Sequence, residues 1–68
     1  MHNQGEIKKI LDQGMLTRSI IETEVAARKC YLYSEMAHDR EVKSFFQKQA
    51  GALDDLTEVF KSKLAEVM

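Results

Sequence analysis

Polar side chains recur on one face of the first helical pattern in this sequence, where a helix that packs in a core would carry apolar residues. Steps of three, four and seven residues separate Glu24, Arg28, Tyr31, Glu35 and His38. A helix turns about 100° per residue, so these side chains share one face or its edge. Buried carboxylates are costly unless they bind a cation, accept hydrogen bonds or become protonated. Metal binding and an ion-pair network therefore compete as explanations.

A metal site on this face would use Glu24, Glu35 and His38. The Glu-x-x-His spacing from Glu35 to His38 points a carboxylate and an imidazole the same way, as in the metal sites of helical bundles. A second chain related by a two-fold axis would add a second set of ligands. A Glu and a His three residues apart are common in a chain that is 31% charged, so the motif has low specificity.

An ion-pair network explains the same residues without a metal. Arg28 lies one helical turn after Glu24 and two turns before Glu35, so it can pair with both carboxylates in a buried or half-buried network. Tyr31 would donate its hydroxyl to this network. A third alternative is that the whole face is turned into solvent.

The remaining residue types argue against most catalytic and nucleic-acid chemistry. Cys30 is the single cysteine, and no Cys or His lies at a helical spacing from it, which excludes a disulfide scaffold and disfavours a catalytic thiol. The ten Lys and Arg residues are interleaved with eleven acids, so no basic stripe for nucleic acid forms. The first residues lack a signal-peptide pattern and no apolar run could span a membrane, so we expect a cytoplasmic protein that does not enter a membrane.

Composition predicts an all-α fold in one small domain, residues 1–68. The chain is 44% apolar, has a net charge of -1, and contains no Pro and only three Gly. Residues that favour helices dominate. A chain of 68 residues has room for a single domain.

The first helix is expected over about residues 4–37. Asn3 can cap its first turn, with Glu6 reaching back, before a stripe at steps of three and four begins at Ile7. The members of this first stripe are Ile7, Ile10, Gly14, Thr17, Ile21, Glu24, Arg28, Tyr31 and Glu35. Cys30 lies on the far side of the helix from this stripe.

A turn at about residues 38–39 and a second helix over about residues 40–67 complete the pattern. Asp39 is a good N-cap and Glu41 lies in the first turn, where negative charge is favourable. The second stripe consists of Val42, Phe46, Gln49, Leu53, Leu56, Phe60 and Val67. Its one polar member, Gln49, would fix the register between chains.

Two helices of this length predict an antiparallel hairpin about 45 Å long. Each helix in a hairpin has one neighbour, so part of its apolar surface remains open to water. We expect homodimerisation into a four-helix bundle to cover it, and a helical partner protein is the other solution.

Residues 24–37 and 41–50 together resemble one helical hairpin of the rubrerythrin branch of the ferritin-like superfamily. The matching feature is the spacing of Glu24 and Tyr31, seven residues apart. The resemblance implies a di-iron centre with Glu24 as a ligand. The family's Glu-x-x-His pair on the second helix is absent here, because Leu53 and Leu56 occupy those positions.

These residues favour a non-enzymatic helical assembly or protein-interaction module without a cofactor, a ferritin-like half-domain that has lost its di-iron centre. The expected partner is a second copy or another helical protein. Leu53 and Leu56 are then expected in the core. The alternative function is iron binding by Glu24, Glu35 and His38 across a dimer.

Overall fold

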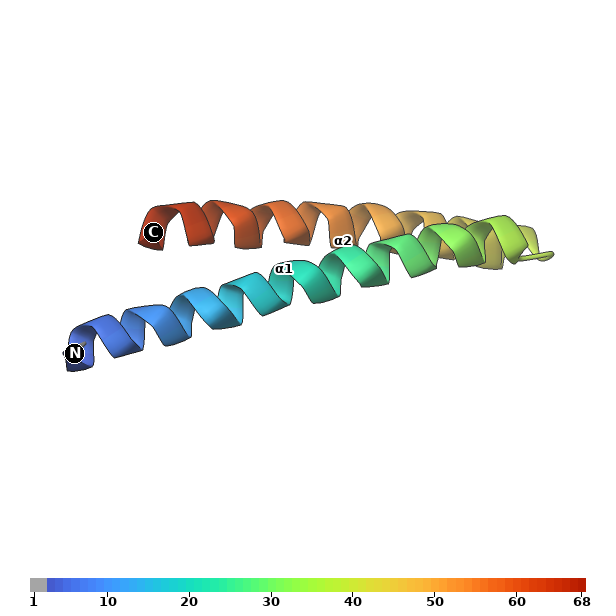
Figure 1. The fold of residues 1–68 in the computed structure, drawn as a ribbon. Coiled ribbons are helices and arrows are strands. Elements are labelled where there is room, and N and C mark those ends of the chain that lie inside the picture. The colour runs from blue at the N-terminus through green and yellow to red at the C-terminus, as the bar shows by residue number, and fades with distance from the viewer. Residues whose placement is uncertain (1–2) are drawn as a thin grey trace.

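The computed structural model describes residues 3–68 and consists of two antiparallel helices, α1 (Gln4–Met36) and α2 (Arg40–Val67) (Figure 1). The helices pack along each other, and the described chain contains no strand. The predicted all-α helical hairpin is confirmed. The first helix ends one residue before the expected boundary, and the second has the expected bounds. The hairpin measures 56 × 17 × 10 Å.

Local capping explains where both helices begin. The Asn3 side chain accepts a hydrogen bond of 2.8 Å from the Glu6 backbone N–H. The Asp39 side chain likewise accepts a hydrogen bond of 3.0 Å from the Val42 backbone N–H. Each bond satisfies a backbone donor that has no partner inside the helix. The two predicted N-caps are confirmed, and the turn between the helices needs no residue with positive φ.

The helices meet along a hairpin interface whose residues recur at alternating steps of three and four, the spacing of a coiled coil. Its residues on α1 are Gln13, Leu16, Ile20, Thr23, Ala27, Cys30 and Ser34, followed by Ala37 at the C-cap, and its residues on α2 are Lys43, Phe46, Ala50, Leu53, Thr57, Phe60, Leu64 and Val67; all are buried or half-buried. The four most buried are small: Ala27, Ser34, Ala50 and Thr57. Small side chains let the two helix backbones approach closely.

Contacts between the helices define their alignment. Thr57 Oγ1 donates to Thr23 Oγ1 at 2.6 Å near the middle of the hairpin. At the open end Gln13 Nε2 donates to the Val67 carbonyl at 3.0 Å. Residues 4–12 therefore extend past the end of α2 by about 13 Å at 1.5 Å per residue, as Figure 1 shows.

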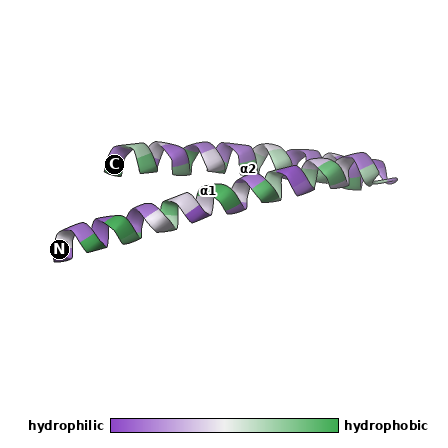
Figure 2. Ribbon diagram, in the orientation of Figure 1, coloured by the Kyte–Doolittle hydropathy of each residue, from purple (hydrophilic) through white to green (hydrophobic). Residues whose placement is uncertain are grey.

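The first stripe lies outside the hairpin interface. Ile7, Ile10, Ile21 and Tyr31 are each about half exposed, because the hairpin interface runs along a different side of α1. Cys30, which lies opposite the first stripe, is half-buried in that interface. Figure 2 shows hydrophobic and hydrophilic residues alternating along both helices.

The second stripe is placed better. Its members Phe46, Leu53, Phe60 and Val67 lie in the hairpin interface. Leu56 was expected in the core with Leu53, but it is 41% exposed in the hairpin. Leu56 lies three residues beyond Leu53, on the side of α2 that turns away from α1.

Candidate functional site

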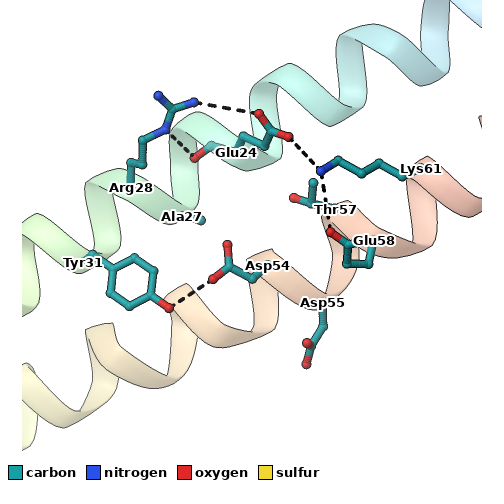
Figure 3. A pocket seen from close by; sticks show the side chains of 9 residues that line it. All are labelled: Glu24, Ala27, Arg28, Tyr31, Asp54, Asp55, Thr57, Glu58 and Lys61. Carbon is teal, nitrogen blue, oxygen red and sulfur yellow. Dashed lines mark hydrogen bonds and ion pairs between the residues drawn. The ribbon is translucent and has the colours of Figure 1, made fainter.

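One flank of the hairpin carries a shallow charged groove between residues 24–31 of α1 and 54–61 of α2 (Figure 3). Its side chains come from positions seven residues apart: Glu24 and Tyr31 on α1, and Asp54 and Lys61 on α2. Positions seven apart lie on one side of a helix. We call this side the charged flank.

Lys61 joins the two helices across the charged flank. Its Nζ lies 3.3 Å from Glu24 Oε1 and 3.6 Å from Glu58 Oε1. The hydrogen bond with Glu24, and then the charge of Glu58, raise the pKa of Lys61. Arg28 Nη2 approaches Glu24 Oε2 at 3.9 Å, and the Arg28 side chain is 74% exposed. Solvent screens these pairs, so each contributes little to stability.

Tyr31 was expected to donate to the Glu24, Arg28 and Glu35 network, and this expectation is wrong. Its hydroxyl donates instead to Asp54 Oδ2 at 3.0 Å across the hairpin. That bond, together with the negative charge of Asp54, raises the pKa of Tyr31. Arg28 pairs with Glu24 in the described chain, while Glu35 is exposed near the turn. The buried triad does not form in the hairpin.

The residues predicted as metal ligands lie at two places in one chain. Glu24 faces Lys61 near the middle of α1, whereas Glu35 and His38 are exposed beside the turn. Eleven residues of helix separate the two carboxylates by about 16 Å. Across residues 3–68, no three side chains of His, Cys, Asp or Glu gather to hold a metal ion. A site shared between two copies stays a prediction.

The opposite side of the hairpin is an apolar flank, which the sequence analysis did not identify. Its large exposed residues are Met15, Tyr33 and Met36 from α1 and Val42, Phe45, Leu56 and Val59 from α2, each 41–62% exposed. The interface residue Phe46 joins the two helices at the turn end. Its ring centroid lies 5.4 Å from that of Tyr33 on α1 and 5.5 Å from that of Phe45 on α2. A second groove, lined by Met15 and Lys63 among others, marks the same side at the open end.

Helical spacing places these residues together. On the apolar flank, Ser19, Ala26 and Tyr33 are seven residues apart on α1, and each directly precedes an interface position. Val42 and Leu56 occupy the equivalent side of α2. The apolar flank thus runs along both helices, and the signal in the sequence is a second set of apolar residues beside the interface positions.

No protein-family model, curated protein or solved structure matches this chain. Neither α1 nor α2 is long and apolar enough to cross a membrane. The structure defines the chain as an all-α helical hairpin with one charged and one apolar flank.

Proposed function

We propose that this chain is a non-enzymatic helical assembly module, in which two copies pair through the apolar flank to form a four-helix bundle. The observation that carries the proposal is the exposure of seven large apolar residues on one side of the hairpin. Contiguous apolar patches beyond a few hundred Å² are uncommon on monomers and mark interaction surfaces.

The surface area of the hairpin supports pairing. The chain exposes 5463 Å². A compact monomer of 7.8 kDa is expected to expose about 4,400 Å², and a compact particle of twice that mass about 7,300 Å². Compact pairing of two hairpins would therefore bury about 3,700 Å² in total, which lies within the range of obligate homodimers.

The interior of a single hairpin is also small for its length. Among residues 3–68, no large side chain is fully buried, and the buried apolar residues are Ala27 and Ala50. Domains below about 70 residues seldom obtain enough stability from one core and commonly add disulfides, metals or a second subunit. Self-association through the apolar flank would supply the missing buried surface.

A ferritin-like origin remains part of the proposal. It is supported by the hairpin itself and by the Glu24 and Tyr31 spacing, with both side chains on the charged flank. Leu53, at a position where the related family has a ligand, is half-buried in the hairpin interface. An apolar residue there suits a bundle held by packing, and Lys61 beside Glu24 supplies positive charge without a metal.

The iron-binding alternative is tested by metal analysis of protein purified without a chelator or a metal-binding tag. We expect no stoichiometric iron or zinc, because Glu24 is paired with Lys61 and Leu53 cannot ligate. One tightly bound metal per dimer that is lost in Glu24→Ala would support the alternative.

Analytical ultracentrifugation tests the assembly itself. We expect a dimer at micromolar concentration, and we expect Leu56→Asp to dissociate it, because pairing would bury a carboxylate without a partner. Leu56 is 41% exposed in the hairpin, so the helices should keep their circular dichroism signal.

Ser62→Asp is the matched control, since it adds the same charge to an exposed position of α2 away from the apolar flank. A wild-type monomer at this concentration would contradict the proposal, and so would equal effects of the two substitutions.

A further inference from the structure

We infer that the second copy docks on the apolar flank with its turn at the opposite end, related by a two-fold axis that passes close to Ala26. This arrangement rests on the proposed self-association and specifies its geometry. Helix α1 of one copy then lies antiparallel to α1 of the other, and α2 lies antiparallel to α2. The charged flank faces outward in both copies.

The shape of the apolar flank favours this arrangement. Its turn end is bulky, because the aromatic rings of Tyr33 and Phe45 are each about half exposed there. At its open end the α1 position equivalent to Tyr33 holds the smaller, half-buried Ser19, beside the flexible side chain of Met15. Near the middle, Ala26 leaves room for a second helix. Turns at opposite ends place the bulky part of each copy against the slim part of the other, as close packing requires.

Charge complementarity supports the same axis. Met15, Glu22, Lys29 and Met36 are spaced seven apart along the rim of the apolar flank, and all are exposed. The midpoint between Glu22 and Lys29 falls between residues 25 and 26, and the midpoint between Met15 and Met36 falls at the same place. If the two-fold axis passes through this midpoint, the antiparallel α1 helices bring Glu22 of each copy beside Lys29 of the other. The same symmetry brings Met15 beside Met36 at both ends.

If the two copies docked with their turns at the same end, the contacts between Glu22 and Lys29 and between Met15 and Met36 would be lost. Helix α1 would then face α2 of the second copy at the same height along the hairpin. The Thr23 to Thr57 contact sets that height, so Glu22 would lie level with the region of Val59 and Lys29 with that of Ala52. Lys29 would then face apolar side chains without a counter-charge, and Glu22 would keep only Arg18 of its own helix, 2.8 Å away, which is less favourable than the cross-axis pair.

Charge exchange tests the pairing of Glu22 with Lys29. We expect Lys29→Glu to raise the dimer dissociation constant about tenfold, because it creates two like-charge contacts per dimer. Adding Glu22→Lys to the same chain restores opposite charges and should bring the constant back toward that of the wild type. Lys48→Glu is the control, since it makes the same charge change at an exposed residue away from the apolar flank.

Cross-linking with a short bismaleimide tests the direction of the second copy. In a Cys30→Ser background, chains carrying Met15→Cys and chains carrying Met36→Cys are mixed or used alone. We expect the mixture to cross-link, because positions 15 and 36 meet across the axis. We expect Met36→Cys alone to give little product, because its two copies lie 21 residues, about 31 Å, apart.

The outcomes separate the arrangement from the assembly. A dimer in which Met36→Cys links to itself more readily than to Met15→Cys, or in which Lys29→Glu acts no more strongly than Lys48→Glu, overturns the arrangement and leaves the assembly intact. A wild-type monomer at micromolar concentration overturns both.

Discussion

The hydroxyl pair at the centre of the hairpin interface gives the sharpest test of how the two helices are held together. Thr57 is 3% exposed, and its Oγ1 donates to Thr23 Oγ1 at 2.6 Å. The Thr23 hydroxyl in turn donates to the Ser19 carbonyl of its own helix at 2.9 Å. We propose to replace each threonine by valine, singly and together. Valine keeps the branched shape and a similar helix propensity, so the substitution removes the hydroxyl alone.

The structure sets the expected magnitudes. Thr57→Val removes one inter-helix hydrogen bond, worth about 1 kcal/mol, and leaves the Thr23 hydroxyl with the Ser19 carbonyl as its acceptor. Thr23→Val costs a similar amount, because the Thr57 hydroxyl can still donate to the Leu53 carbonyl, 2.9 Å away. The double variant lacks both hydroxyl groups, so neither is left without a hydrogen-bond partner. Replacing both partners by apolar groups of similar shape is nearly neutral, so two single losses of about 1 kcal/mol each imply a coupling free energy of about 2 kcal/mol.

Thermal and urea unfolding of the four proteins measure this coupling. Each single variant should lower the melting temperature by about 4–8 °C, the effect of 1 kcal/mol in a domain of this size. All four are compared at one protein concentration, because association makes the melting temperature concentration-dependent. Additive losses, with the double variant about 2 kcal/mol less stable than wild type, would refute the argument that the pair acts as a unit.

Three further predictions concern individual side chains. Ala50→Leu should destabilise by about 1–3 kcal/mol in urea unfolding, because Ala50 is 0% exposed and a larger side chain must push the helices apart; an unchanged midpoint would contradict the close packing. Arg28→Met should cost about 1 kcal/mol or less at pH 7, since the side chain is 74% exposed, and a larger loss would indicate a buried network. In a Tyr33→Phe background, the ultraviolet absorbance of the Tyr31 phenolate should appear above the ordinary pKa of about 10. Asp54→Asn should lower this pKa, and the stability that Tyr31 contributes below pH 10 should be lost as the pH rises through its raised pKa.

The helix boundaries could be predicted because they depend on local chemistry. Asn3 and Asp39 each cap the backbone three residues ahead, so a short stretch of sequence contains the information. The absence of proline and the scarcity of glycine leave both helices uninterrupted between these caps. A hairpin then follows from two long helices joined by a turn of three residues.

The face of α1 that meets α2 could not be predicted in the same way. Helix α1 carries large apolar residues on its outer side, such as Ile10 and Ile21, and its interface contains small or polar ones such as Ser34. A search for apolar periodicity selects the stripe with the larger residues. The contact from Tyr31 to Asp54 spans 23 residues, so no spacing along one helix could reveal it.

The contrast between the interface and the apolar flank links folding to association. Ala27 and Ala50 let the helices approach closely, and larger interface residues such as Phe46 are half-buried, so the hairpin alone removes only part of their apolar surface from water. Leu56 and Val59 lie outside the hairpin interface and offer further apolar surface for burial. The hairpin interface therefore sets the alignment of the two helices, while the proposed pairing would add hydrophobic stabilisation that a single hairpin lacks. In such a protein, dissociation should leave a hairpin that is still helical but less stable, because the flank that binds the second copy also adds buried apolar surface.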